Sequence, residues 1–205
     1  MSDIVIIGAD GMLGRCWTEL LAARGIEHVA TTLAELDITD SSAVSGFITP
    51  GTQWVVNCAA YTLVDAAEEH ETLANEVNVQ YSTDYVFDGT ATAPYPTDHA
   101  RSPVNAYGRS KALGEELIEQ SGVEHLLVRS SWLYAPWAKN FVLTIRELAK
   151  VRESLRVVDD QRGRPTDGRR LAEVSLTLAE TGSRGVFHVT DAGECSWFEL
   201  AALVA

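Results

Sequence analysis

Residues 4–14 read IVIIGADGMLG, an apolar run that passes directly into three evenly spaced glycines. A continuous apolar run such as 4–7 is typical of a strand buried on both faces of a parallel sheet. Apolar residues then recur at near-helical spacing over 12–24, and Gly25 suits the end of a helix. The stretch therefore predicts a strand, a glycine turn and a helix in succession.

The glycines have the spacing G-x-x-G-x-x-G between the predicted strand and helix, which is the placement that a dinucleotide site needs. Gly8 permits the tight turn, Gly11 lets the backbone approach a pyrophosphate, and Gly14 allows the helix to pack closely on the sheet. Free N–H groups at the helix start would face the phosphates. A glycine-rich turn without a ligand is the alternative. The residues expected to contact the cofactor here are Gly8, Asp10, Gly11, Met12, Leu13 and Gly14.

Short apolar runs and helical patterns alternate along the rest of the chain, which indicates βα units on a parallel sheet. Further strands are expected at 28–31, 54–57, 125–129, 155–158 and 185–189, and further helices at 41–48, 63–79, 106–120, 169–180 and 197–205. The stretch 88–105 contains three prolines and predicts a long loop, which in a compact domain is often functional.

The fold class is therefore α/β, a Rossmann-like doubly wound parallel sheet. We assign the NAD(P)-binding part to residues 1–135 and a mixed, small C-terminal substrate-binding part to 136–205, interleaved with the first. Because the apolar end, residues 202–205, stops inside a helical pattern, we expect this second part to be incomplete.

Composition excludes several classes of protein. The 205 residues fit one domain, and 46% hydrophobic residues can build a sizeable core. The net charge of −13 disfavours nucleic-acid and anionic-membrane partners, because an acidic surface repels phosphates. No apolar run approaches the roughly 20 residues that span a bilayer, and the N-terminus has no basic signal region, so we expect a cytoplasmic protein. The three cysteines and five histidines show no metal-ligand spacing, so no metal is expected.

The end of the second predicted strand bears on the choice of cofactor. An acid there would hold the ribose 2′-hydroxyl of NAD and repel a 2′-phosphate. Residues 30–33 read ATTL, with no acid before Glu35 and no arginine. The sequence therefore leaves NADPH and NADH both open. Asp37 could accept a hydrogen bond from the adenine amino group, or it could be a turn aspartate.

Tyr107 and Lys111 have Y-x-x-x-K spacing on a predicted helix, so they share one face. A nearby cation favours the phenolate and lowers the tyrosine pKa from about 10. Such a tyrosine can give a proton to a developing alkoxide near neutral pH. Because this spacing is common by chance, the alternative is that the two residues lie on an exposed helix face. The pair indicates a catalytic site only in combination with the glycine turn.

Residues 81–89, YSTDYVFDG, begin like a strand and break into polar residues at its end. In open α/β sheets, ligands bind beyond the carboxyl ends of the strands. A hydroxyl such as that of Thr83 could donate to a substrate carbonyl and polarise it. In the alternative, Thr83 and Asp84 form local turn hydrogen bonds at an ordinary strand end.

Together these motifs resemble the extended short-chain dehydrogenase/reductases and, more narrowly, the dTDP-4-dehydrorhamnose reductase family. The segments 82–87 (STDYVF), within the signpost 81–89, and 129–134 (RSSWLY) are specific to the narrower family, whereas the glycine turn and the Tyr/Lys pair are generic. The other signposts are 36–40, 57–62, 64–68, 160–166 and Ser196-Trp197.

The resemblance implies NAD(P)H-dependent reduction of the 4-keto group of a dTDP-linked 4-keto-6-deoxy sugar, such as dTDP-4-dehydrorhamnose. By this analogy Tyr107 is the proton donor, Lys111 binds the cofactor ribose and tunes Tyr107, and Thr83 bonds to the reacting oxygen. Asp84 and Trp132 would contact the sugar. The cofactor would further be lined by Asp37, Ile38, Ala59, Ala60, Tyr61 and Tyr81, and the substrate side built by Arg162, Gly163, Pro165 and Thr166. For Trp132, a buried aromatic after a strand is the alternative.

One departure from the family concerns the middle of the chain. A long helix and a strand normally lead from the Asn78-Val79 pair into the Ser-Thr-Asp segment, but here Gln80 is followed at once by Tyr81. Roughly 15–20 residues are absent, about the length of a crossover helix plus half a strand. Either the chain has lost this unit or the sequence omits it. We favour omission, because the downstream motifs match; an intact mass well above 22.3 kDa would support it.

Two other functions remain open on the same fold: a catalytically silent NAD(P)-binding regulatory subunit, and a sugar-nucleotide epimerase or dehydratase that keeps its cofactor bound. The retained Thr83, Tyr107 and Lys111 argue against the silent subunit. The sequence leaves open the exact sugar, the stereochemistry at C4 and whether the protein is a homodimer.

Overall fold

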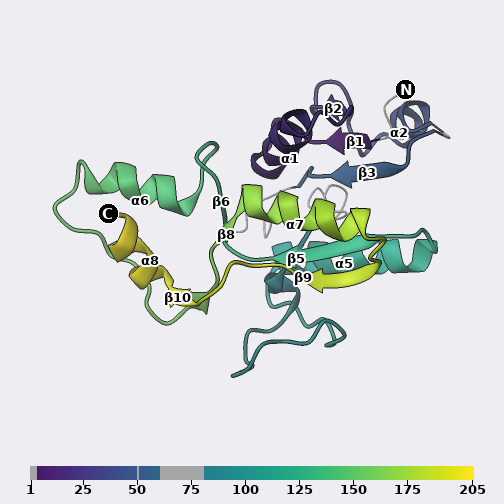
Figure 1. Ribbon diagram of the computed structural model, residues 1–205. Coiled ribbons are helices and arrows are strands. Elements are labelled where there is room, and N and C mark those ends of the chain that lie inside the picture. The colour runs from purple at the N-terminus through teal and green to yellow at the C-terminus, as the bar shows by residue number, and fades with distance from the viewer. Residues whose placement is uncertain (1–3, 50, 61–80) are drawn as a thin grey trace.

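The computed structural model describes residues 4–49, 51–60 and 81–205 (Figure 1). Its first sheet is parallel, with the strand order β2-β1-β3. The central strand β1 (Ile4–Ile7) pairs with β2 (Val29–Thr31) on one side and with β3 (Trp54–Asn57) on the other. All four residues of β1 are buried, as their continuous apolar run predicts.

The second sheet is also parallel, with the order β4-β5-β9. It consists of β4 (Ser82–Thr83), β5 (Leu126–Ser130) and β9 (Gly185–His188). Figure 1 shows the arrows of β1, β3 and β9 pointing the same way, so the carboxyl ends of both sheets lie on one side of the molecule.

Helices cover both faces of the sheets. Alternate residues of β1 face opposite ways: Ile4 and Ile6 join the core cluster that contains α1, whereas Val5 and Ile7 join the one that contains α2. In Figure 1, α7 lies in front of β5 and β9, and α5 lies behind them. The α/β, doubly wound class is therefore confirmed. The main helices are α1 (Met12–Ala23), α2 (Ser41–Phe47), α5 (Ala106–Ser121) and α7 (Gly168–Glu180).

The remaining elements are short and lie mostly in the C-terminal part. Strand β6 (Leu133–Tyr134) pairs in parallel with β8 (Thr166–Asp167), and β7 (Arg162–Gly163) pairs antiparallel with β10 (Cys195–Ser196). The other elements are a 3₁₀ turn, η1 (Asp84–Val86), and the helices α6 (Phe141–Ala149) and α8 (Trp197–Val204).

One expected strand is wrong, because residues 155–158 form neither helix nor strand. The Val158 carbonyl instead accepts a hydrogen bond from the Phe198 amide at the start of α8, 3.0 Å away. The predicted loop at 88–105 is confirmed. The helix expected at 63–79 lies outside the described residues.

The two sequence halves are interleaved in space. Helix α7 packs against α1, and β9 pairs with β5, so residues from beyond 135 complete layers that the first part begins. The boundary at 135 stays a prediction. Within the described helices, none combines the length and the apolar character needed to cross a membrane.

Candidate active site

The glycine turn has the close backbone contacts that its spacing predicts. Gly8 has a φ of +72°, which a residue with a side chain adopts only with strain. A Cβ on Gly8 would lie 2.7 Å from the Ala59 amide nitrogen, and one on Gly14 only 2.1 Å from the Gly8 carbonyl oxygen. Glycine at these positions therefore lets β1, α1 and the segment after β3 meet without side chains between them.

The amino end of α1 is open to an anion. Gly11 is its N-cap and offers no side chain to the first turn, which also contains no acidic residue. Asp10 is exposed, whereas the Leu13 side chain belongs to the core, so any ligand contact of Leu13 is through its backbone. Uncapped N–H groups and the helix dipole favour a phosphate here.

The end of β2 is built from local turns. The Glu35 carboxylate accepts hydrogen bonds from the Thr32 amide and hydroxyl, at 2.8 and 2.9 Å. The Asp37 carboxylate likewise binds the Thr39 amide and hydroxyl, which lowers the Asp37 pKa. Asp37 is thus a turn aspartate, as one of the two alternatives predicts. Its contact with adenine, and that of the half-buried Ile38, stay predictions.

The residues expected to line the cofactor after β3 divide into three cases. Ala59 lies against Gly8, and its amide donates to Asn57 Oδ1 at 3.0 Å, so it belongs to the glycine corner; Ala60 follows it, half-buried. Tyr61 lies outside the described residues. Tyr81 turns toward α1, where its hydroxyl accepts a hydrogen bond from Trp17 Nε1 at 2.9 Å.

Thr83 lies buried at the carboxyl end of β4. Its hydroxyl donates to Asp84 Oδ1 at 3.1 Å and accepts from the Tyr85 amide at 3.2 Å. Desolvation raises the Asp84 pKa to about 6, against the hydrogen bond from Thr83, although part of Asp84 is open to solvent. The local turn hydrogen bonds are therefore present, and they orient the Thr83 hydroxyl.

Tyr107 lies in the first turn of α5 and reaches the end of β4. Asn105 caps this helix by accepting the Gly108 amide at 2.7 Å. A Cβ on Gly108 would lie 2.2 Å from the Tyr85 carbonyl oxygen, so glycine lets α5 approach η1 closely. The expected lowering of the Tyr107 pKa by Lys111 is wrong: burial raises this pKa well above its ordinary value, and the neighbouring Thr83 hydroxyl opposes the rise. The structure thus joins two of the three predicted catalytic residues.

Lys111 lies one turn further along α5, with its Nζ 6.0 Å from the Tyr107 ring centroid. It is 3% exposed, and burial lowers its pKa to about 8. No carboxylate within the described ranges lies at ion-pair distance from the ammonium. A buried cation is costly unless other groups complete its hydrogen bonds, and ligand hydroxyls could do so here. The three predicted catalytic side chains are therefore neighbours.

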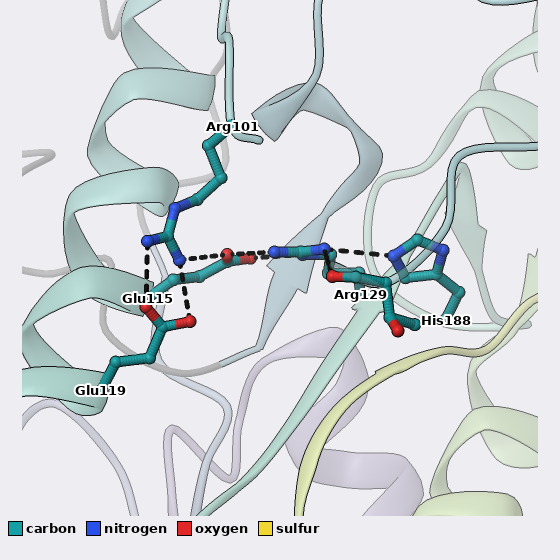
Figure 2. A network of polar contacts seen from close by, with 6 residues as sticks. Arg101, Glu115, Glu119, Arg129 and His188 are labelled. Carbon is teal, nitrogen blue, oxygen red and sulfur yellow. Dashed lines mark hydrogen bonds and ion pairs between the residues drawn. The ribbon is translucent and has the colours of Figure 1, made fainter. Parts of the chain in front are cut away.

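A buried ion pair fixes the same helix to the second sheet (Figure 2). Glu115, one turn after Lys111, binds Arg129 of β5 through two hydrogen bonds of 2.8 and 2.6 Å. Arg101 bridges Glu115 and Glu119 from the loop before α5, and Arg129 also contacts His188 Nε2 at 3.2 Å. The network joins α5, β5, β9 and the loop. It therefore fixes the position of α5, with Tyr107 and Lys111, relative to the second sheet.

Trp132 follows β5 and has a left-handed backbone, with a φ of 46°. Its ring stacks on that of Trp197 at the start of α8, with centroids 3.6 Å apart. A Cβ on Gly163 would lie 2.4 Å from Trp132 Cε2, so glycine is required beneath the indole. Such backbone strain in a bulky residue costs about 1–3 kcal/mol and often marks a functional position. Trp132 is half-buried, and its sugar contact stays a prediction.

Comparison with known proteins decides the family. The family model described as the RmlD substrate binding domain matches residues 1–80 and 77–205. A dTDP-4-keto-6-deoxy-D-glucose reductase of Streptomyces niveus is 39% identical over 97% of this chain and 76% of its own length. This chain belongs to the dTDP-4-dehydrorhamnose reductase family. A crystal structure of a dTDP-4-dehydrorhamnose reductase from Bacillus anthracis, in complex with NADP, superposes with a TM-score of 0.95 at 35% identity, covering 100% of this chain and 80% of that one. The predicted resemblance is confirmed.

The family match breaks where the sequence departs from the pattern. It falls into two parts that meet at 77–80, next to the junction of Gln80 and Tyr81. The spore coat polysaccharide biosynthesis protein SpsK of Bacillus subtilis, 36% identical, aligns over 225 positions that include 100% of this 205-residue chain and 78% of SpsK. At least 20 positions of that reductase-family alignment therefore have no counterpart here.

Several residues that build this reductase-family site were not singled out from the sequence. Gly108 carries a signal, because a glycine inside a helical pattern costs about 1 kcal/mol relative to alanine and needs a packing reason. Asn105 carries another, as a good N-cap residue before the helix. The partnership of Glu115 with Arg129 and the stacking of Trp197 on Trp132 left no local signal, since both join residues far apart in the chain.

Proposed function

We propose that this chain reduces the 4-keto group of a dTDP-linked 4-keto-6-deoxyhexose with NADPH or NADH. The observation that carries the proposal is that the Thr83 hydroxyl, the Tyr107 phenol and the buried Lys111 ammonium are neighbours. It is supported by the reductases named above, which act on dTDP-linked keto sugars, and by the NADP complex of the Bacillus anthracis relative.

The described residues fit a dinucleotide. The open amino end of α1 and the space left by Gly8 and Gly14 suit a pyrophosphate, and Lys111 suits the ribose hydroxyls next to the nicotinamide. When bound, the nicotinamide supplies a hydride to the carbonyl carbon of the sugar. Glu35, the first acid after β2 in the sequence, is held by Thr32, which is compatible with a 2′-phosphate.

The protein's part is to manage the oxygen of the ketone. As C4 is reduced, negative charge develops on this oxygen. The Tyr107 phenol is protonated at neutral pH, because burial raises its pKa, so it can donate its proton to the forming alkoxide. The Thr83 hydroxyl lies beside it to bond the same oxygen, and the Lys111 ammonium stabilises the phenolate that Tyr107 becomes.

The sugar is expected to contact Asp84 and Trp132. Asp84 adjoins Thr83, and Trp132 stacks on Trp197 but is only half-buried, so part of the indole is open to a sugar. These two contacts are carried over from the family by position and are the substrate side of the proposal.

An assay of NADPH and NADH oxidation with dTDP-4-dehydrorhamnose and dTDP-4-keto-6-deoxy-D-glucose tests the function. We expect cofactor oxidation that depends on the sugar, with one reduced sugar formed per cofactor consumed. Cofactor binding without turnover of any dTDP-4-keto sugar would point instead to a silent regulatory subunit. A cofactor that stays bound and oxidised through dilution would point to an epimerase or dehydratase.

A further inference from the structure

The indole of Trp137 is held by residues of two helices that are far apart in the sequence. The guanidinium carbon of Arg15, on α1, lies over its ring at 4.5 Å from the centroid, and that of Arg169, on α7, lies at 4.6 Å. Glu19 of α1 accepts a hydrogen bond from each arginine, at 3.1 and 3.3 Å. A cation over an indole is attracted by the negative face of the ring. Two arginines joined by one carboxylate therefore fix the plane of a side chain that is only half-buried.

The edge of the same indole is bonded to the first residue of α1. Trp137 Nε1 donates to the Met12 carbonyl at 3.1 Å. This carbonyl and the Leu13 amide belong to one planar peptide unit. The Leu13 N–H is one of the uncapped groups at the start of α1, where the proposed function places the pyrophosphate. A hydrogen bond to the carbonyl of a peptide fixes its plane and polarises its N–H, so the indole orients a donor of the proposed phosphate site.

The stretch that carries Trp137 also carries a proposed sugar contact, Trp132. Strand β6 lies between the two tryptophans and is paired with β8. At the far end, the Asn140 side-chain amide donates to the carbonyls of Ala135 and Ala138, at 2.8 and 3.2 Å, and its Oδ1 caps α6. Figure 1 shows α6 and α8 to one side of the two sheets, so this stretch leads from the sheets to the helices beside them. Its backbone is held throughout, and a shift at one tryptophan would therefore reach the other.

Backbone strain marks both ends of this stretch. Within the described part of the chain, the non-glycine residues with positive φ are Trp132, at 46°, and Ala138, at 60°. A residue with a side chain adopts this conformation only at a cost, and the strain persists where the surrounding contacts over-determine the backbone. One strained residue is the tryptophan of the sugar side, and the other adjoins the tryptophan at the start of α1. The strain is therefore tied to the placement of these two indoles.

We propose that Trp137 is a positioning residue, which fixes the cofactor end of α1 and the sugar-side stretch 132–140 in one arrangement. It acts on the pyrophosphate through the peptide between Met12 and Leu13, and on the sugar through the backbone that leads back to Trp132. This role rests on the proposed function, because it takes the amino end of α1 as the pyrophosphate site and Trp132 as a sugar contact. The affinity for both ligands then depends on a residue outside the reacting groups.

The first test is Trp137→Phe, which removes the indole N–H and keeps an aromatic ring beneath the arginines. We expect Kd for NADPH and for NADH to rise about three- to tenfold, the equivalent of one hydrogen bond, with kcat at saturation and the sugar KM within about twofold. Calorimetry gives the two Kd values. Trp54→Phe makes the same exchange on β3, where Trp54 pairs with Ile4 at the opposite end of β1 from the glycine turn. It should leave both Kd values unchanged.

The second test is Trp137→Ala, which removes the ring as well as its N–H. The stretch 132–140 then loses its attachment to α1 and α7, so the sugar KM should rise about fivefold in addition to the cofactor Kd. Arg170→Ala is the matched control on α7, because Arg170 pairs with Glu173 and has no contact with the indole. It should change neither constant. Steady-state kinetics with a dTDP-4-keto sugar, together with thermal unfolding of each variant, complete the comparison.

The proposal is overturned if Trp137→Phe binds both cofactors as tightly as the unaltered protein, or if Trp54→Phe weakens them equally. It is also overturned if Trp137→Ala lowers Tm but leaves Kd and KM unchanged, which is the pattern of a purely structural residue. The proposed function fails separately: an unaltered protein that binds cofactor without turning over any sugar is not a reductase, yet its cofactor Kd still decides the role of Trp137. An unaltered protein that binds neither NADPH nor NADH would refute both.

Discussion

Strands β1 and β4 each lead into a part of the candidate site, yet they differ in how they are held. All four residues of β1 pair with β3 and three of them also pair with β2, and the glycine corner follows this strand. β4 has two residues with a described partner on one side, and it carries Thr83 at its end. The position of Thr83 is nevertheless defined, because its hydroxyl donates to Asp84 and accepts from the Tyr85 amide, and α5 packs against β4.

The difference teaches that the catalytic end of a strand can be held from outside the strand. At β1 the sheet itself positions the turn. At β4 the helix α5 does so, and α5 is anchored in turn by Glu115 and Arg129. Changes at the reacting groups should therefore affect turnover alone, whereas changes at the anchor should affect stability.

The largest effect is expected from Tyr107→Phe, which removes the proton donor and keeps the ring. We expect kcat to fall about 10²- to 10⁴-fold, with the cofactor Kd and the Tm close to those of the unaltered protein. Steady-state kinetics, cofactor titration and thermal unfolding measure the three quantities. Tyr95→Phe removes a phenol that binds Asp88 in the neighbouring loop and should keep kcat within twofold. An unaltered kcat in Tyr107→Phe would refute its role.

Glu115→Gln should break the anchor of α5. It leaves the Arg129 guanidinium buried without its carboxylate, so we expect a loss of about 3 kcal/mol in the free energy of unfolding. Glu119→Gln removes the exposed acid that shares Arg101 and should cost less than about 0.5 kcal/mol. Urea denaturation at pH 7 gives both free energies of unfolding. Equal losses in the two variants would show that the buried pair contributes no more to stability than the exposed one.

The same anchor predicts a pH dependence of stability. Burial raises the Glu115 pKa, but hydrogen bonds from Arg129 outweigh it, and the folded-state pKa is lowered. The stabilisation is therefore complete above the unfolded-state pKa near 4.5 and is lost as the pH falls through the folded-state value. Below about pH 5, the unaltered protein should lose stability more steeply than Glu115→Gln as the pH is lowered.

Lys111 should set the alkaline limit of activity. Burial lowers its pKa to about 8, whereas the Tyr107 pKa is raised, so the lysine loses its proton first. We expect kcat/KM to fall about tenfold per pH unit above pH 8, because the neutral amine no longer stabilises the phenolate. In Lys111→Arg the guanidinium stays charged, so this limb should disappear, at a lower absolute rate. If kcat/KM of Lys111→Arg still falls above pH 8, the titrating group is not Lys111.

The smallest effect is expected on the substrate side. Trp197→Ala removes the ring that holds Trp132 in its left-handed conformation, so we expect KM for the sugar to rise about fivefold with kcat within twofold. Phe198→Ala changes the adjacent, half-exposed residue and should alter neither constant. A loss confined to kcat, or equal effects of both variants, would separate Trp132 from sugar binding.

The sequence predicted the parts of the site that depend on local spacing. The glycines of the first turn and the four-residue interval from Tyr107 to Lys111 are such parts, because a turn or a helix places these residues by itself. It did not predict which groups meet across elements, such as Glu115 with Arg129, since that depends on how α5 lies on the sheet. The strand expected at 155–158 failed for a related reason: an apolar pattern does not show whether a sheet edge is within reach.

The packing of α1 against α7 has a consequence for biosynthesis. Leu21 of α1 is fully buried, together with Leu171 and Leu176 of α7, which follow it by about 150 residues. While a ribosome is still making the middle of the chain, the apolar face of α1 lacks the cover that α7 provides. The glycine corner should therefore gain its protection from proteases late in synthesis, after α7 has emerged, and ribosome-bound chains that end before α7 should remain clients of chaperones.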